Sequence, residues 1–566
     1  MTYHYGLTKT PRETFYQLAS TATLIGVDTE TVSLSNRTLL GIGISFNPHD
    51  AYYVTEESNE FEIVLEILRR KRIRKIYHNA PFDLRVLRKY NVDIDDVEDT
   101  ALMARLAMAD SAVLEDLSFW LEPYGSKQTQ SASALIAEYK GHTMADLPTD
   151  VVAKKCCQDA CAALLLFNKY SQEIDMKYYE RLRRLIGPLE RISRQGIKLD
   201  QTVLNVLNTE YSREEVRLRA LFRRIGFNVS SLFETGYTLS ERGNALPFLP
   251  RSKLLATDSA NLRKLDDPLV VPILRWREIS KKLSTYILPW IGEDRAYTTL
   301  RMEAATGRVN STNAGELEKD RNLQNIPKVT DIGKSVTIRS AFIPDNGVFT
   351  LADKSQLELR ILAHRSQDEN MLAVFRVDGD IHDDTARRMN LPRVRAKNFT
   401  FGIQYGGEAA VIAAAIGTND LRMVAEQIPL WYQSYPQAAA YFAEQEKFGY
   451  DNGYVVTSGG RKIRIPWELG EKHGKNCCRN YPIQGTAAED EFEFMNWVVD
   501  ETDWIEITRL QLHDELMFDG QVELPGMVLS QEKSKEGELV YEVKGELAML
   551  SGFYAPIEVT VRERWG

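Results

Sequence analysis

The feature that most constrains this chain is an acid placed between a short apolar strand and a helix. Residues 348–352 (VFTLA) predict a buried strand, and Asp353 follows directly at its end. From Leu357 to Leu362, apolar and polar residues mix as on a helix that is half exposed to a cleft. An aspartate in this position can hold a metal ion rigidly. The simpler alternative is an ordinary turn in which Asp353 begins the helix, and the other motifs must decide between the two.

Length and composition indicate a protein of several domains. The 566 residues are too many for one hydrophobic core, and 43% hydrophobic with 27% charged residues describe a soluble globular chain. We expect no membrane segment and no signal peptide, because long apolar runs are missing from the sequence. The five cysteines cluster in two places without zinc-site spacing, which favours reduced thiols and a cytoplasmic location, in the host if the protein is viral.

Charge alone does not decide whether the chain binds nucleic acid. The net charge is −10, yet residues 177–300 carry 22 Lys and Arg against 14 Asp and Glu. A basic middle between two acidic segments suits a protein that grips phosphates and holds metal ions on either side. Solvated helix faces would give the same counts, so the decision rests on the motifs.

Residues 1–175 show strands that alternate with helices, which predicts a mixed α/β layer. Strands are expected at 24–30, 39–46, 51–54 and 75–79, and helices at 61–70 and 151–170. Elements far apart in this segment carry four acids: Asp28, Glu30, Asp83 and Asp159. Two divalent cations about 3.5–4 Å apart need such a set, and they can activate water and stabilise the leaving 3′ oxygen in phosphodiester hydrolysis.

The basic middle segment predicts helices suited to a nucleic-acid backbone. Residues 201–225 form a long Arg-rich amphipathic pattern, whereas residues 236–254 contain the Gly and Pro of a loop. A second helix is expected over residues 272–286, with cations at Arg275, Arg277, Lys281 and Lys282. Such cations can clamp phosphates without reading the base sequence.

A stripe of four side chains marks the next segment. Arg393, Lys397, Phe401 and Tyr405 are four residues apart, so on a helix they form one stripe that drifts by about 40° per step. Two cations followed by two aromatic rings match a triphosphate followed by its base, and Lys397 could protonate or neutralise departing pyrophosphate. On its own, such a stripe is more often an amphipathic surface.

Two further acids stand at a predicted hairpin tip. Residues 505–512 and 516–518 predict strands, and Asp514 and Glu515 lie between them after His513. Neighbouring acids repel each other unless a cation or exposure to water relieves them. This pair could therefore complete a metal site with Asp353.

Together these segments resemble DNA polymerase family A, the group of bacterial DNA polymerase I and its phage relatives. Asp353-x-Ser-Gln-x-Glu-x-Arg360 is similar to the first palm motif of that family, and residues 393–406 are similar to its fingers motif. Family segments near the primer and template resemble residues 306–311, 322–327 and 480–488, the last expected to begin a helix. Asp28-x-Glu30, Asn79-x-x-Phe-Asp83 and Asp159-Ala resemble the family's proofreading 3′–5′ exonuclease.

The resemblance implies a multidomain α/β and α+β fold, in which a ribonuclease H-like exonuclease domain precedes a right-hand polymerase of thumb, palm and fingers. The expected ranges are 1–175 for the exonuclease, 176–300 for the segment leading into the polymerase and its helical thumb, 301–365 and 451–566 for the palm, and 366–450 for the fingers. It implies a template-directed DNA polymerase, a nucleotidyltransferase that extends a primer 3′ end with deoxynucleotides by two-metal phosphoryl transfer, in replication or repair.

The same resemblance implies the site residues. Catalysis is assigned to Asp353, Asp514, Glu515 and Lys397, with Asp353 and Asp514 as ligands of the polymerase metal ions. The incoming nucleotide is expected to contact Gln356, Glu358, His382, Arg393, Lys397, Phe401 and Tyr405. Primer–template DNA is expected to contact Arg308, Gln324, Asn325, Asn480, Gln484, Gln511 and His513. The exonuclease metal ligands are expected to be Asp28, Glu30, Asp83 and Asp159.

Three positions depart from the family pattern. Lys155 stands where the exonuclease motif has a tyrosine that orients the attacking water, so hydrolysis is expected to be slow or to use another residue. Lys354 replaces an aromatic residue, and only its backbone carbonyl is expected to matter. Lys328 and Val329 stand where family members often carry an arginine, so the contact of that arginine is assigned to neither residue.

The implied cofactors are two Mg²⁺ ions per active site, with Mn²⁺ as an alternative, and the implied partners are primer–template DNA and deoxynucleoside triphosphates. We expect a monomer without membrane contact, without a 5′-nuclease domain ahead of residue 28, and with a layout like that of phage enzymes; no residue identifies a processivity partner. One alternative is a single-subunit RNA polymerase, against which Glu358 and residues 484–488 argue. The other is a nuclease or DNA-binding protein with a scaffold in place of the polymerase, against which the intact Asp353, Lys397 and Asp514 argue.

Overall fold

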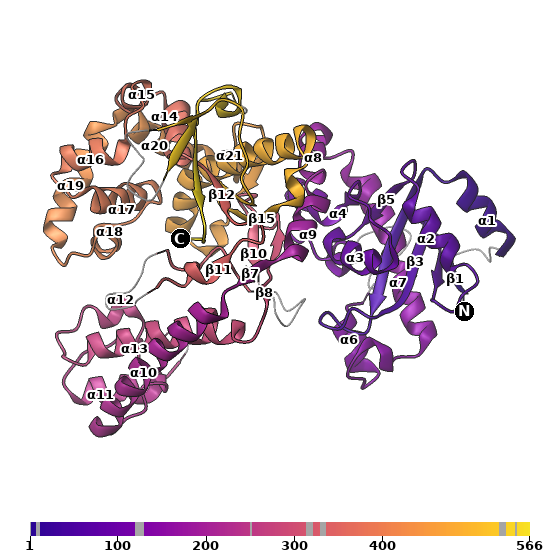
Figure 1. Cartoon of the computed structure of the whole chain (residues 1–566), viewed down its shortest axis with the longest axis horizontal. Helices are drawn as coiled ribbons and strands as arrows, with labels where there is room; N and C mark the ends of the chain where they lie inside the picture. The colour runs from indigo at the N-terminus through magenta and orange to yellow at the C-terminus, as the bar shows by residue number, and fades with distance from the viewer. Residues whose placement is uncertain are drawn as a thin grey trace.

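The computed structural model describes residues 2–6, 12–118, 130–249, 252–312, 321–328, 336–530, 539–549 and 552–566. In Figure 1 the N-terminal residues form a sheet with helices around it, and the C-terminal half forms a second body around another sheet. Helices α10 (Gln201–Ile225) and α13 (Val270–Lys282) extend below that second body. Within the described residues, no helix is both long and apolar enough to cross a membrane.

The N-terminal sheet has six strands. Its strands are β1 (Thr2–Gly6), β2 (Leu24–Thr31), β3 (Leu39–Asn47), β4 (Asp50–Val54), β5 (Arg74–Tyr77) and β6 (Glu98–Asp99). They lie in the order β1-β4-β3-β2-β5-β6, with antiparallel pairing from β1 to β2 and parallel pairing from β2 to β6. The strands expected between residues 24 and 79 are therefore confirmed, although the last of them ends at Tyr77.

Helix α7 (Thr149–Tyr170) packs directly against this sheet. Glycines on β2 and β3 permit the close approach: a Cβ atom on Gly26 would lie 2.1 Å from the Ala160 carbonyl oxygen, and one on Gly43 would lie 2.7 Å from that of Cys156. The chain's five cysteines are free thiols and all are buried. Other helices of this part are α1 (Arg12–Thr21), α2 (Phe61–Arg69), α3 (Ala80–Leu87), α4 (Thr100–Leu106), α5 (Leu114–Ser118) and α6 (Ala132–Glu138).

The basic middle segment is helical, as expected, but one predicted loop is partly wrong. Its elements are α8 (Met176–Arg183), α9 (Ile186–Gln195), β7 (Ile197–Leu199), α10, α11 (Leu232–Glu241), α12 (Ser259–Leu262) and α13. The expected loop at 236–254 begins inside α11, because Ser231 caps that helix by accepting a hydrogen bond from the Glu234 amide at 3.2 Å. A π-helical turn, Leu283–Ile287, then continues the chain beyond α13.

A second six-stranded sheet lies at the centre of the C-terminal half. Its strands are β12 (Phe349–Lys354), β15 (Thr508–Leu512), β16 (Glu515–Asp519), β17 (Met527–Leu529), β18 (Val540–Val543) and β19 (Ile557–Arg562). The order is β15-β16-β12-β19-β18-β17 and every pair is antiparallel. The strand expected from residue 505 begins at Thr508, since Trp504–Glu506 form a 3₁₀ turn. Short strands elsewhere are β8 (Arg295–Ala296), β9 (Thr299–Arg301), β10 (Asn310–Thr312), β11 (Phe342–Ile343), β13 (Tyr454–Val456) and β14 (Lys462–Arg464).

Helices surround this sheet. They are α14 (Leu357–Ser366), α15 (Glu369–Arg376), α16 (Ile381–Met389), α17 (Arg393–Gln404), α18 (Ala409–Ile416), α19 (Leu421–Ser434), α20 (Pro436–Asn452) and α21 (Glu471–Glu501). Two expectations were wrong. Residues 357–363 of α14 are buried all round instead of half exposed. Residues 480–488 do not begin a helix but lie inside α21, whose buried packing offsets the hydrogen bond that Pro482 cannot donate.

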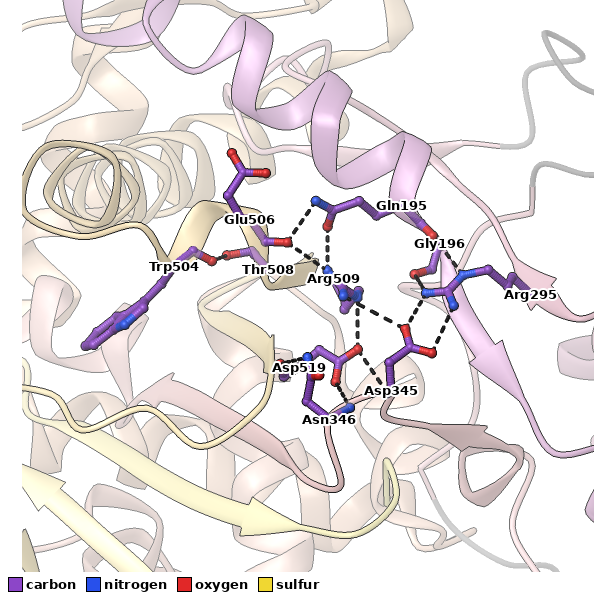
Figure 2. A network of polar contacts seen from close by, with 10 residues as sticks. All are labelled: Gln195, Gly196, Arg295, Asp345, Asn346, Trp504, Glu506, Thr508, Arg509 and Asp519. Carbon is purple, nitrogen blue, oxygen red and sulfur yellow. Dashed lines mark hydrogen bonds and ion pairs between the residues drawn. The ribbon is translucent and has the colours of Figure 1, made fainter.

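A network of polar contacts ties the β15–β16 hairpin to the end of α9 (Figure 2). Arg509 donates to the Gln195 side chain at 2.6 Å and to Asp519 Oδ2 at 3.1 Å. Asp519 in turn accepts hydrogen bonds from the backbone amides of Asp345 and Asn346. The hairpin is thus braced at its base, so its other end, with Asp514, has a defined position relative to β12.

Candidate active sites

A cleft of about 610 Å³ opens at the end of the central sheet and collects most of the polymerase residues expected from sequence. The expected residues that line it are Arg308, Gln324, Asn325, Asp353, Gln356, Glu358, His382, Arg393, Lys397, Phe401, Tyr405, His513, Asp514 and Glu515. They come from β12, α14, α16, α17, the β15–β16 turn and the segments around β10. Residues more than two hundred positions apart in sequence, such as Arg308 and Asp514, therefore line one cleft.

Three acids meet at one end of this cleft. Asp353 on β12 stands directly opposite Glu515 on β16, and the Lys354 amide donates to the Asp514 carbonyl oxygen at 3.0 Å. His513 makes the tight turn between β15 and β16 with a φ of 60°, a conformation that most residues avoid. Burial, with Asp514 and Glu515 nearby, raises the pKa of Asp353 well above its usual value. A divalent cation would relieve this repulsion, which is consistent with Asp353 and Asp514 as metal ligands.

Glu358 is held in place by three donors. Its Oε1 pairs with the Arg308 guanidinium, and its Oε2 accepts hydrogen bonds from Gln404 Nε2 at 2.7 Å and from the Tyr405 hydroxyl at 3.1 Å. Arg308 was expected to contact DNA, and the structure shows it engaged with Glu358. Gln404 was not predicted from the sequence as a site residue. It is buried, and it lies one residue before Tyr405, outside the predicted stripe of α17.

Helix α17 presents its expected stripe to the cleft. Phe401 and Tyr405 stack with ring centroids 5.9 Å apart, and His382 lies against Phe401 at 5.6 Å. Arg393 pairs with Asp380 and Asp383, whereas Lys397 has no ion-pair partner within the part of the chain that the structure describes. Burial lowers the pKa of His382 to about 4, with Lys397 and Arg393 adding to the effect, so its imidazole is neutral near pH 7.

Three glutamines in or next to the cleft make hydrogen bonds to the backbone. Gln511 was expected at the primer end, but it is buried and its Nε2 donates to the His513 carbonyl oxygen at 2.7 Å. Gln324 donates to the Gln511 carbonyl oxygen at 3.0 Å, and Gln356 accepts from the Ile381 amide at 3.0 Å. Asn480 and Gln484 lie on α21 and do not line the cleft.

The side chain of Lys354 does more than expected. It leaves β12 on the face opposite to Asp353 and forms an ion pair with Asp490 of α21, in which both side chains are almost fully buried (1% and 2% exposed). Its ammonium also donates to the Asp490 carbonyl oxygen at 3.2 Å. The expectation that only its backbone matters was therefore wrong: Lys354 joins β12 to α21 directly beneath Asp353.

A second group of acids lies on the N-terminal sheet. Oxygen atoms of Asp28, Glu30 and Asp159 come within 4.8 Å of one another and could hold a metal ion. Asp83, also expected as a ligand, is not in this group, because its Oδ1 accepts hydrogen bonds from the Thr29 amide and hydroxyl at 2.8 and 2.7 Å. Burial raises the pKa of Asp83 to about 7, and burial with the neighbouring acids raises that of Asp28.

Lys155 lies among these acids. Its Nζ is 2.9 Å from Glu30 Oε1 and 2.5 Å from Asp159 Oδ2. Although burial disfavours its charge, the carboxylates of Asp159, Glu30 and Asp28 hold the pKa of Lys155 above its usual value. The charged Lys155 side chain therefore lies between two of the carboxylates that could bind a metal ion.

The cations expected to clamp DNA mostly have partners within the chain. Arg275 pairs with Glu214 at 2.8 Å, Arg277 donates to the Thr257 carbonyl oxygen and hydroxyl, and Lys282 pairs with Glu278 at 2.8 Å. Lys281 is exposed. These contacts hold the α10–α13 helices together, so Lys281 is the expected cation best placed for phosphates.

Two family models match the two parts of the chain that carry these groups of acids. Residues 200–530 match the family model "DNA polymerase family A", and residues 4–175 match the model "3'-5' exonuclease". The chain is 30% identical over 455 residues to DNA polymerase I of Chloroflexus aurantiacus, covering 73% of this chain and 47% of that protein. It is 34% identical over 343 residues to the thermostable DNA polymerase I of Thermus aquaticus, covering 55% of this chain and 40% of that protein.

A solved structure shares the fold. The polymerase domain of Pol1 from M. smegmatis, in complex with DNA primer-template and dNTP, superimposes with a TM-score of 0.73 at 23% identity and covers 98% of both chains. The chain spans about half the length of the curated relatives it matches. Because the family model covers more than half of this sequence and includes Asp353, Lys397 and Asp514, the chain belongs to DNA polymerase family A, with a 3′–5′ exonuclease domain before the polymerase.

Proposed function

We propose that this chain is a template-directed DNA polymerase that extends a primer 3′ end with deoxynucleotides. The observation that supports this most is the cleft in which Asp353, Asp514 and Glu515 face Lys397 and Phe401 of α17. One end of the cleft is acidic and suits metal ions, whereas the other is basic and aromatic and suits a triphosphate with its base.

Asp353 and Asp514 would hold two Mg²⁺ ions, with Mn²⁺ as an alternative, and Glu515 would support them as a neighbouring acid. When bound, these ions lower the pKa of the primer 3′-hydroxyl and neutralise charge on the phosphates. The 3′-hydroxyl would lose its proton to water, and its oxygen would bond to the α-phosphorus of the nucleotide while the bond from that phosphorus to the bridging oxygen breaks and pyrophosphate leaves. Lys397 donates a proton from Nζ to the departing pyrophosphate, and Arg393 exchanges Asp380 for a phosphate oxygen.

Glu358 would select the sugar. Its three donors fix the carboxylate against the place of the incoming ribose, so a 2′-hydroxyl would meet a group that cannot move aside. This feature favours a DNA polymerase over a single-subunit RNA polymerase. Phe401, where some family members have a tyrosine, would discriminate against nucleotides that lack a 3′-hydroxyl.

The partners we propose are primer–template DNA and deoxynucleoside triphosphates, bound by a monomer in the cytoplasm. The related Pol1 structure is described as a complex with both kinds of molecule. The named relatives are bacterial DNA polymerase I enzymes, so replication or repair follows as the role, while a phage origin stays a prediction. Asp28, Glu30 and Asp159 would serve a 3′–5′ exonuclease that removes mismatched ends.

A labelled primer tests the proposal. A primer with a 5′ label, annealed to a longer template, is incubated with Mg²⁺ and deoxynucleotides; we expect full extension, no extension in EDTA, and a preference for deoxynucleotides over ribonucleotides. Asp353→Asn is the matched control, since it keeps the shape of the side chain and removes the charge that holds metal. Primer binding without extension would refute the proposal and favour a DNA-binding scaffold.

A further inference from the structure

The ammonium group of Lys155 lies among the acids of the exonuclease domain. Lys155 Nζ bridges Glu30 Oε1 at 2.9 Å and Asp159 Oδ2 at 2.5 Å, and the three side chains are between 7% and 11% exposed. These are two of the three carboxylates whose oxygens lie within 4.8 Å of one another. The ammonium therefore does not stand beside the group but takes up oxygen atoms that a metal ion would need.

The position of Lys155 follows from the fold. Lys155 and Asp159 are one turn apart on α7, so their side chains leave the same face of the helix. The helix meets β2 and β3 at close range because Gly26 on β2 and Gly43 on β3 leave room for its backbone. The side chain of a lysine at this position of α7 therefore points toward the acids of β2.

Charge balance limits what else the group can bind. When Asp28, Glu30 and Asp159 are all ionised, as ligands of a metal ion are, they carry three negative charges, and the Lys155 ammonium cancels one of them. The remaining two match one divalent cation, whereas two divalent cations would bring four positive charges to the same oxygens. Asp28 still has an open coordination position, since its Oδ2 is buried and accepts no hydrogen bond from the described residues.

We propose that the Lys155 ammonium takes the place of one of the two divalent cations, so that this centre binds a single metal ion. The proposal rests on the exonuclease function proposed above and makes it specific: the centre is a one-metal site next to Asp28, with a fixed positive charge between Glu30 and Asp159. The same contacts argue against Lys155 as a substitute for a water-orienting tyrosine, because its ammonium is already engaged by carboxylates.

Counting bound ions tests this directly. Mn²⁺ binding to the full chain is measured by electron paramagnetic resonance and calorimetry, in a background of Asp353→Asn and Asp514→Asn that removes metal binding at the polymerase cleft. We expect about one Mn²⁺ per chain with Lys155 present and about two after Lys155→Tyr or Lys155→Met. The first ion should also bind about tenfold or more tightly once the positive charge is removed.

Three controls make the count specific. Lys154→Met changes the exposed lysine one position earlier on α7 and should leave one ion bound. Lys155→Arg keeps the positive charge and should also leave one. Asp28→Asn with Asp159→Asn should abolish binding, which assigns the counted ions to this group. Circular dichroism on each variant excludes misfolding as the cause of a changed count.

The outcomes separate this inference from the proposed function. Two ions bound with Lys155 in place, or the same count in Lys155→Tyr and Lys155→Met as in the parent, would overturn the inference. Primer extension by the unmodified chain depends on the other site and tests the polymerase alone. Slow shortening of a mismatched primer that accelerates in Lys155→Tyr, together with a second bound ion, would support both the inference and the exonuclease function.

Discussion

The buried ion pair between Lys354 and Asp490 gives the sharpest stability prediction. Both side chains are almost fully buried, and the pair joins β12, which carries Asp353, to α21. Lys354→Met keeps the length of the side chain but leaves the Asp490 carboxylate buried without its counter-ion. Removing one partner of a buried pair costs about 3–5 kcal/mol, because the remaining charge stays in a medium of low dielectric.

The size of the effect can be stated as a melting temperature. A change of 1 kcal/mol in the free energy of unfolding shifts the melting temperature of a domain of this size by about 2–4 °C. Lys354→Met should therefore lower the melting temperature by about 6–20 °C. The double variant Lys354→Met/Asp490→Leu removes both charges and should recover most of this loss, since apolar replacements of a buried pair are often neutral or stabilising. Lys544→Met is the matched control: its pair with Asp378 is exposed and contributes about 0–1 kcal/mol.

Scanning calorimetry of the four proteins measures these shifts. The transition that contains the central sheet should move down in Lys354→Met and return toward the parent in the double variant. A melting point for Lys354→Met within about 2 °C of the parent would refute the reasoning, since the expected cost is several times larger. Equal losses in the single and the double variant would also refute it, because the loss would then come from packing and not from the uncompensated charge.

Further predictions concern the cleft. Glu358→Ala should lower the preference for deoxy- over ribonucleotides by about 100-fold in kcat/KM, and Gln404→Ala should lower it less, without changing the affinity for primer–template. Lys397→Ala should reduce kcat by about 10²–10⁴-fold in single-turnover assays, while the Kd for DNA stays nearly constant. His382 has its pKa lowered to about 4 in the folded protein, so the unfolded chain binds more protons between about pH 4 and 6.5. Stability should therefore rise with pH through that window and be complete above it, and urea titrations of His382→Gln should show a flatter dependence.

Elements with signals at both ends could be predicted closely. The helix expected at 201–225 is α10, residue for residue, because Asp200 caps its start and Gly226 adopts the left-handed conformation at its end. Asp353 lies at the end of a buried strand and faces a cleft, as its position between strand and helix indicated. Local chemistry therefore located the elements and the acids, while the catalytic roles of these residues remain predictions.

Contacts between distant segments could not be predicted in the same way. Lys354 and Asp490 are 136 residues apart, and Gln404 meets Glu358 across 46 residues, so no local pattern reveals either contact. The resemblance of residues 480–488 to a family segment led to the wrong start for α21, and only tertiary packing lets the helix pass through Pro482. Lys155 was recognised as a departure, but its contact with Glu30 needs the packing of α7 on β2.

The two unexpected lysines have opposite consequences because a strand and a helix direct their side chains differently. On β12, neighbouring side chains point to opposite faces, so the Lys354 ammonium pairs with Asp490 of α21. On α7, residues four apart share a face, so Lys155 points at the same acids as Asp159 and competes for them. The ammonium of a lysine next to Asp353 therefore pairs with a distant acid, whereas the ammonium of a lysine four residues before Asp159 contacts the acids of the exonuclease domain.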